Sequence, residues 1–183
     1  MISGKARGRR LRSVPGELTR PITDRSKEAL FNIIGADIEG ALFLDLFAGT
    51  GSVGIEALSQ GAARAVFFDL QRQAIETIRA NLKITGVEEF ATIRKINSFS
   101  YLERQPDEHF DYVFIAPPQY KALWKRAVYS LEKNPGWLAE DAWVIVQIHP
   151  VEYEALDLIT LAEFDQRRYG SVLFVFYQKR GEK

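Results

Sequence analysis

Two short segments of the chain combine residue types that could bind one ligand and act on another. The first starts with the carboxylate Asp45 and runs through Phe47 and Ala48 into the turn Gly49-Thr50-Gly51. Glycine has no Cβ, so its backbone can turn sharply and approach a ligand closely. The second is Ala116-Pro117-Pro118-Gln119-Tyr120, whose prolines donate no N–H and leave their carbonyl groups free to face a substrate. The segments predict a nucleotide-binding turn and a second possible site.

The glycine turn lies between an apolar run and amphipathic sequence. Residues 41–46 are predicted to form a buried strand, and residues 52–60 the helix that follows. Strand, tight turn and helix form the first unit of a nucleotide-binding α/β sheet, in which the helix N-terminus offers free N–H groups. Further strands are expected at 65–69, 91–96, 111–115 and 143–148, further helices at 71–85 and 120–133, and a first helix after the N-cap Thr23.

The last two strand-like runs, about 158–168 and 171–178, are joined by Tyr169-Gly170 without a clear helix between them. Such a pair predicts an antiparallel hairpin. The expected fold is therefore α/β and Rossmann-like: a seven-stranded, mostly parallel, doubly wound sheet with a C-terminal antiparallel hairpin. Asp-x-Phe-x-Gly-x-Gly followed later by Pro-Pro-x-Tyr resembles the motifs of S-adenosylmethionine-dependent methyltransferases that act on an amino group.

Polar side chains also follow other strands of the predicted sheet. Asp69 ends the second strand, and Asn97 and Ser98 come directly after the third. In open α/β sheets the ligand lies beyond the carboxyl ends of the strands, so these residues are expected to converge with the glycine turn. Asp45 could then bind the ammonium group of the ligand, directly or through water. Asp69 could accept both ribose hydroxyls, and Asn97 or Ser98 could bind the adenine edge.

A different class of cofactor also fits part of the pattern. Gly49-x-Gly51-x-x-Gly54 matches the dinucleotide fingerprint, and Asp69 lies at about the expected distance of 20 residues. An NAD-dependent oxidoreductase is therefore an alternative, which calorimetry with S-adenosylhomocysteine and NAD would decide. A nucleoside triphosphatase is disfavoured because the chain has no Gly-x-x-x-x-Gly-Lys-Ser/Thr loop.

Charge is unevenly distributed along the 183 residues. Residues 1–27 hold eight basic and two acidic side chains, a net charge of +6, so the remainder carries −6. This predicts a basic N-terminal arm over residues 1–20, extended or hairpin-like, ahead of a methyltransferase domain over residues 21–183. A basic arm on an acidic body points to a phosphate-rich partner. The RNA-binding residues that we expect are Lys5, Arg7, Arg9, Arg10, Arg20, Thr23, Asp24 and Arg25.

Composition excludes several other classes of protein. The chain has no cysteine and two histidines, so a metal site is not expected. No apolar run approaches the ~20 residues of a membrane span, and the N-terminus has no apolar signal core. We therefore expect a cytoplasmic protein that is not bound to a membrane and acts as a monomer.

Nearly the whole chain resembles the RsmD-type bacterial 16S ribosomal RNA (guanine-N2)-methyltransferases. The resemblance rests on the blocks 4–11, 20–25 and 28–32, on Leu44–Gly51 and Gly54–Leu58, and on 110–114 and Tyr169-Gly170. It implies S-adenosylmethionine as the cofactor, methylation of a guanine exocyclic N2 as the reaction, and the small ribosomal subunit or an assembly intermediate as the partner.

One position departs from the family pattern. After the fourth strand the family has Asp-Pro-Pro followed by Tyr or Phe, whereas this chain has Ala116 in place of the Asp, and its aromatic residue, Tyr120, comes one position later. The carboxylate that would accept a hydrogen bond from the guanine amino group is therefore absent. This leaves an alternative function, a cofactor-binding RNA-binding protein with weak or lost methyltransferase activity.

Overall fold

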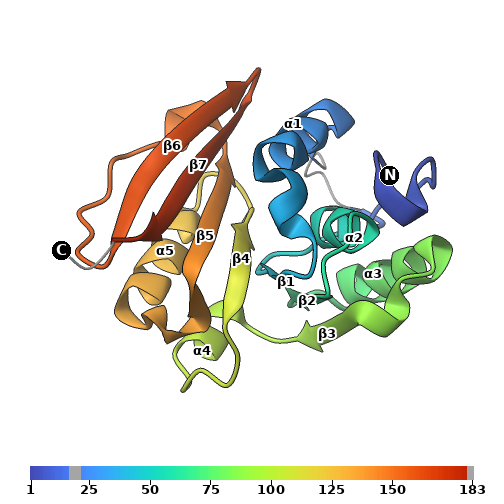
Figure 1. Ribbon diagram of the computed structural model, residues 1–183, viewed down its shortest axis with the longest axis horizontal. Coiled ribbons are helices and arrows are strands. Elements are labelled where there is room, and N and C mark those ends of the chain that lie inside the picture. The colour runs from blue at the N-terminus through green and yellow to red at the C-terminus, as the bar shows by residue number, and fades with distance from the viewer. Residues whose placement is uncertain (17–21, 181–183) are drawn as a thin grey trace.

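A sheet of five parallel strands and an antiparallel hairpin forms the centre of the computed structural model, which describes residues 1–16 and 22–180 (Figure 1). The strand order is β3-β2-β1-β4-β5-β7-β6, and β7 pairs antiparallel with both β5 and β6. The predicted seven-stranded sheet with its closing hairpin is confirmed. The strands are β1 (Leu42–Asp45), β2 (Arg64–Asp69), β3 (Ala91–Lys95), β4 (Phe110–Ile115), β5 (Leu138–Ile148), β6 (Leu161–Tyr169) and β7 (Val172–Lys179).

Helices cover both faces of the sheet, which explains why the central strands are apolar on both sides. One face packs against α1 (Asp24–Ile34), α2 (Ser52–Ser59) and α3 (Arg72–Thr85). The other packs against the short α4 (Ser98–Leu102) and α5 (Leu123–Lys133). Single 3-10 turns complete the described part: η1 (Gly4–Ala6), η2 (Gly35–Ile38), η3 (Glu88–Phe90), η4 (Pro135–Trp137) and η5 (Pro150–Glu152).

Three local differences from the sequence predictions have physical reasons. Strand β5 begins at Leu138 rather than 143, because a register shift lets the exposed pair Glu140-Asp141 bulge out of an otherwise paired strand. Helix α4 was not predicted, since five residues are too few to show a helical period. Helix α5 begins at Leu123 rather than 120, because Tyr120 and Ala122 adopt positive φ angles of 62° and 52°.

The N-terminal segment folds against α2 instead of extending into solvent. Glu56, which is fully buried, accepts the backbone N–H groups of Ile2 and Ser3 at 3.0 and 2.9 Å. The Oγ of Ser59 accepts the N–H of Ala6, one turn further along the same helix face. The predicted boundary between arm and domain at residue 20 lies outside the described residues, so that division stays a prediction.

Gly54 allows α2 to approach strand β2. A Cβ atom at this position would lie 2.4 Å from the ring of the buried Phe67. We expect Gly54→Ala to lower the free energy of unfolding by about 1–3 kcal/mol through overpacking, although Ala is the better helix former. Urea denaturation measures this change. The control Ser52→Ala lies in the same helix and is expected to stay within about 0.5 kcal/mol of the wild type. Equal stability of the Gly54→Ala variant would contradict the close packing.

Candidate functional site

The glycine turn is fastened to the strands on both sides of β1. The N–H of Leu46 donates to the carbonyl of Phe114 in β4, at 3.0 Å, and the N–H of Ala48 donates to the carbonyl of Phe68 in β2, at 2.9 Å. The N–H of Gly49 donates to Oδ2 of Asp69 at 3.0 Å. The turn after β1 and the carboxylate at the end of β2 therefore meet at the carboxyl edge of the sheet, where the sequence places them.

Asp69 holds its position through two backbone hydrogen bonds. Its Oδ2 accepts from Gly49, and its Oδ1 accepts the N–H of Gln71 at 2.9 Å. Each carboxylate oxygen can accept a further hydrogen bond, because an ionised carboxylate offers about four acceptor positions. Asp69 thus fixes the turn and can still accept hydroxyl groups of a ligand.

Asp45 is almost fully buried, with 2 % of its surface exposed, at the end of β1. Its Oδ1 has no hydrogen-bond partner among the residues that the structure describes. Burial raises the pKa of this carboxyl from 3.8 to about 7, the nearby N–H groups of Gly54 and Phe47 lower it less, and the charge of Asp69 raises it further. A buried, unpaired carboxylate is costly by itself, and it favours a bound cation or ammonium group.

The glycines of the turn leave space and free donors. Gly49 has a φ of +53°, and a Cβ there would meet no atom within 4 Å, so its Cα faces open space. Gly51 precedes α2 in the left-handed conformation and provides no side-chain cap. A Cβ at Gly51 would press on Ile55 and Ile78 at 3.2–3.3 Å. Gly51 therefore leaves the first N–H groups of α2 without a side-chain cap.

Asn97 and Ser98 lie beside the turn, and both side chains also have structural partners. The Oδ1 of Asn97 caps α4 by accepting the N–H groups of Phe99 and Ser100. The buried hydroxyl of Ser98 donates to the carbonyl of Leu46 and so joins α4 to the end of β1. A contact with a ligand's adenine edge by either residue stays a prediction.

The predicted Phe47 and a second aromatic residue that the sequence did not single out, Phe99, form an apolar wall at this edge. Phe99 packs edge-on against Phe47, with ring centroids 5.9 Å apart, and the guanidinium of Arg126 lies 4.0 Å from the centre of the Phe99 ring. The only sequence signal for Phe99 was its position two residues after Asn97. The wall provides an apolar surface next to the turn.

The loop after β4 is exposed and is held by the loop after β5. Ala116 and Pro117 are half-buried, whereas Pro118, Gln119 and Tyr120 are exposed. The N–H of Tyr120 donates to Oε1 of Glu152 at 2.8 Å, and the Tyr120 side chain is 69 % exposed. Its ring centroid lies 6.3 Å from that of His149, which the sequence left without a role. The two loops therefore lie next to each other at the carboxyl edge.

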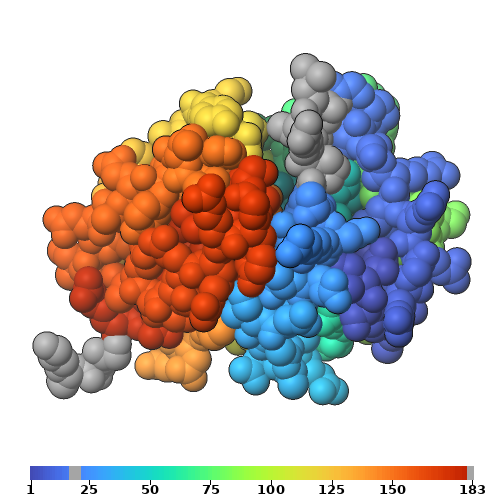
Figure 2. Space-filling view, turned by 90° about the horizontal axis from the view of Figure 1, so that it is seen from above, coloured from blue at the N-terminus to red at the C-terminus, as the bar shows by residue number. Residues whose placement is uncertain are grey.

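The basic residues of the N-terminal segment are exposed. Arg7, Arg9 and Arg10 face solvent, and the ammonium of Lys5 lies 5.8 Å from the ring centre of Phe90. Figure 2 views the molecule from above Figure 1 and shows this segment and α1 (blue) on the same side of the C-terminal hairpin (orange to red). The segment thus presents its charge on the side of the sheet that α1, α2 and α3 cover.

The residues around the start of α1 divide into a cap and two exposed charges. Thr23 accepts the N–H of Ser26 and so caps the helix, as its sequence position predicts. Asp24 is exposed and lies 3.7 Å from the ammonium of Lys27, and Arg25 is exposed. Arg20, which was also predicted to bind RNA, lies outside the described residues.

Asn81 connects the N-terminal segment to the glycine turn and was missed in the sequence. This fully buried side chain of α3 accepts the N–H of Arg12 at 2.7 Å and donates to the Arg12 carbonyl at 3.0 Å. It also donates to the carbonyl of Thr50 at 2.9 Å. Its one sequence signal is an amide within the apolar stripe of a helix. Asn81 therefore fixes the backbone of Arg12 next to the glycine turn.

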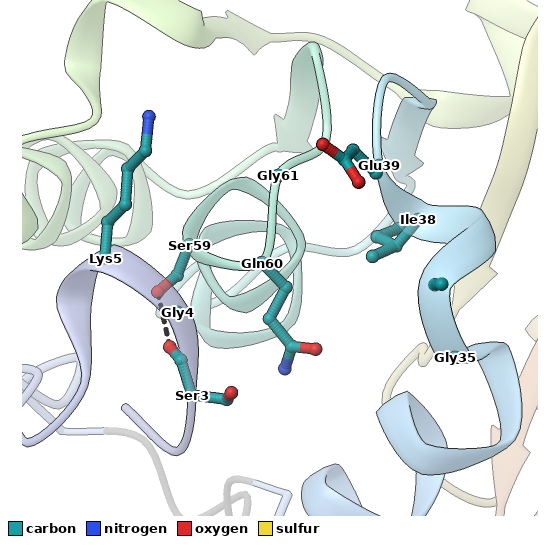
Figure 3. A pocket seen from close by; sticks show the side chains of 10 residues that line it. Ser3, Gly4, Lys5, Gly35, Ile38, Glu39, Ser59, Gln60 and Gly61 are labelled. Carbon is teal, nitrogen blue, oxygen red and sulfur yellow. Dashed lines mark hydrogen bonds between the residues drawn. The ribbon is translucent and has the colours of Figure 1, made fainter.

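A separate groove lies elsewhere, at the other end of α2. It measures about 610 Å³ and opens between η1, η2 and the residues after α2 (Figure 3). Figure 3 shows Gln60 extending between the N-terminal segment and the chain around Gly35, and Ser59 bonded to Ser3. Lys5 and Glu39 are its charged residues. It contains none of the residues that the sequence predicts to bind the cofactor.

Two further features are absent from residues 1–16 and 22–180. There, no group of three or more His, Asp or Glu side chains is arranged to hold a metal ion. No helix of that part is both long and apolar enough to span a membrane.

The sheet order, the turn after β1 and the C-terminal hairpin define the class of S-adenosylmethionine-dependent methyltransferases. The chain belongs to the family described as Conserved hypothetical protein 95, whose model matches residues 1–178.

Three relatives illustrate the extent of the similarity. The chain is 35% identical over 184 residues to YlbH of Bacillus subtilis (strain 168), covering 99% of both chains. It is 36% identical over 147 residues to Ribosomal RNA small subunit methyltransferase D of Escherichia coli (strain K12), covering 80% of this chain and 73% of that protein. The solved structure of yhhF from Escherichia coli superposes with a TM-score of 0.86 and 32% sequence identity, covering 99% of this chain and 97% of that one.

Proposed function

We propose that this protein methylates the exocyclic N2 of a guanine in 16S ribosomal RNA, within the small ribosomal subunit or an assembly intermediate of it, with S-adenosylmethionine as methyl donor. The observation that carries the proposal is the buried Asp45, whose Oδ1 has no hydrogen-bond partner among the described residues, next to a glycine turn that Asp69 holds in place. Membership of the family and the name of the Escherichia coli relative support the same reaction. We further propose that the protein acts as a monomer in the cytoplasm.

Four sets of residues would hold the donor at this site. Asp45 would bind its ammonium group, Asp69 its ribose hydroxyls, and Asn97 or Ser98 its adenine edge. Residues 47–51 would line the site of the donor. The donor supplies an activated, electrophilic methyl group when it is bound. The arrangement fits such a ligand because Oδ1 of Asp45 has no hydrogen-bond partner among the described residues and Gly49 faces open space.

The rest of the task is positioning the acceptor. The guanine amino nitrogen is a weak nucleophile, because its lone pair is delocalised into the ring. Pre-organised geometry can lower such a barrier by roughly 7–11 kcal/mol. The Pro117 carbonyl would orient the amino hydrogens and Tyr120 would stack on the base, which must leave its helix to reach the site. Gln119 is a further polar group of this exposed loop.

Transfer of labelled methyl groups tests the proposal. Small subunits from a strain that lacks the modification are incubated with the protein and labelled S-adenosylmethionine, and the labelled nucleotide is mapped. We expect stoichiometric label on one guanine N2 of 16S RNA. No label at high protein concentration, together with retained binding of RNA and S-adenosylhomocysteine, would favour the second candidate, a cofactor-binding RNA-binding protein, for which the missing carboxylate at Ala116 is the specific observation.

The basic segment gives a salt-dependent prediction. Arg9 and Arg10 are exposed, and each contact with an RNA phosphate releases a counterion. The double variant Arg9→Gln/Arg10→Gln should therefore bind RNA more weakly, and its slope of log K against log salt should be shallower by about one to two. Filter binding at several salt concentrations measures both. The control Arg104→Gln/Lys133→Gln removes two exposed charges from the side of the sheet that α4 and α5 cover. An equal effect of the two variants would contradict a specific role of the segment.

A further inference from the structure

Gln147 places a buried amide oxygen near the carboxyl end of β5. Its Oε1 has no hydrogen-bond partner among the residues that the structure describes. An unpaired acceptor shielded from water lowers the stability of the folded state. The oxygen therefore lowers the stability of the folded state, and no contact within the described residues offsets this loss.

The face of Gln147 follows from the alternation of side chains along β5. Val144 and Val146 pack into the core on the side of α4 and α5, and Trp143 and Ile145 pack on the side of α1 and α2. Gln147 lies two residues after Ile145 and so shares its face. Ala116 packs against the same α1 and α2 side. Both side chains therefore stand on one face of the sheet.

The strand register sets the two residues next to each other. Ile115 of β4 is paired with Val146 of β5, so one residue further along Ala116 lies beside Gln147. Adjacent strands are about 4.8 Å apart, which a glutamine side chain can bridge. The amide thus borders the position at which the resemblance expects a carboxylate and the chain has only a methyl group.

The loops that follow β4 and β5 are joined to each other. Glu152 accepts the N–H of Tyr120 from the β4 loop through Oε1 and the N–H of His149 from its own loop through Oε2. The two loops are therefore held together beyond the strand ends that carry Ala116 and Gln147, and the Tyr120 side chain is exposed there.

We propose that the side-chain oxygen of Gln147 accepts a hydrogen bond from the exocyclic amino group of the target guanine, in place of the carboxylate that is absent at Ala116. This inference rests on the proposed function of the site. It makes Gln147 a catalytic residue that selects a base with an amino group and aligns that group. A neutral amide does not take up the proton that the nitrogen releases after transfer, so this proton leaves to water.

The test compares single-turnover rates of labelled methyl transfer to small subunits that lack the modification. Gln147→Met keeps the length of the side chain but removes the acceptor, and we expect the rate to fall about tenfold, as for one lost hydrogen bond. Affinity for S-adenosylhomocysteine should stay unchanged and the melting temperature should not fall, because the costly acceptor is gone. The double variant Ala116→Asp/Gln147→Met should recover the rate, because it restores a carboxylate.

A matched control removes another buried, unpaired polar atom from the other face of the sheet. Tyr177→Phe deletes such a hydroxyl group and should transfer methyl groups at the wild-type rate. An unchanged rate in Gln147→Met would overturn the inference, as would a loss of rate accompanied by lost affinity for S-adenosylhomocysteine, or the absence of rescue by Ala116→Asp. Failure of the wild type to transfer label would overturn the proposed function itself and this role with it.

Discussion

Replacing Asp45 with Asn is expected to weaken the binding of S-adenosylhomocysteine about 10- to 100-fold, the loss of one hydrogen bond to a charged group. The carboxylate is buried at the end of β1, and its Oδ1 has no hydrogen-bond partner among the described residues. Asn keeps the shape of the side chain and removes the charge. Calorimetry at pH 8 measures the affinity. Asp24→Asn, which removes an exposed carboxylate, serves as the control and should bind as the wild type does.

The same substitution is expected to stabilise the free protein, and the gain should depend on pH. The pKa of Asp45 is about 7 in the folded state and 3.8 as an ordinary carboxyl group, so the folded state binds the proton more tightly. Protonation of Asp45 therefore stabilises the folded state. This stabilisation is complete below about pH 4 and is lost as the pH rises to about 7, and the total loss is up to about 4 kcal/mol. Asn does not titrate.

Thermal unfolding at pH 4.5 and pH 8 checks this linkage. The melting temperature of Asp45→Asn should exceed that of the wild type more at pH 8 than at pH 4.5. An advantage that does not change with pH would show that burial of Asp45 does not raise its pKa. If Asp45→Asn binds the cofactor more weakly and is more stable than the wild type, then Asp45 favours cofactor binding and lowers the stability of the fold.

Asn81→Leu is expected to lower the free energy of unfolding by about 2–4 kcal/mol, because it leaves the N–H and carbonyl of Arg12 and the carbonyl of Thr50 without their partner. It should also release the basic segment from the glycine turn. We expect faster hydrogen exchange over residues 9–14 and weaker RNA binding. Urea denaturation and hydrogen-exchange mass spectrometry measure the two effects.

Thr85→Val provides the control in the same helix. The hydroxyl of Thr85 bonds only to carbonyls of α3 itself, Asn81 and Leu82, so its loss should cost less than about 1 kcal/mol and leave the segment in place. If Asn81→Leu unfolds at the wild-type urea concentration, or if exchange over residues 9–14 is unchanged, the bridge between segment and turn is not what holds them together.

The fold was largely readable from the sequence because its central strands are short apolar runs that end at polar or glycine residues. Asp45 and Asp69 could be assigned to the carboxyl edge for that reason, and the structure brings them to the same turn. Helix α4 and the start of β5 were missed, because one is shorter than a helical repeat period can reveal and the other contains an exposed acidic bulge.

The polar contacts between distant segments could not be predicted. Glu56 and Asn81 are polar residues on helix faces that are otherwise apolar, and their partners in the N-terminal segment lie more than 50 residues away in the chain. The position of Gln147 beside Ala116 could not be predicted either, because it follows only from the register of β4 and β5. Periodicity identifies a buried face but does not identify the partner of a polar residue on it.

Hydrogen exchange of the full chain with and without saturating S-adenosylhomocysteine tests most directly whether the carboxyl edge of the sheet is the donor site. The account predicts slower exchange in residues 45–51, 69–71 and 96–99 when the compound is bound. It predicts no change in residues 3–6 and 59–61, which border the groove of Figure 3. Protection confined to that groove, with the glycine turn unaffected, would contradict the account.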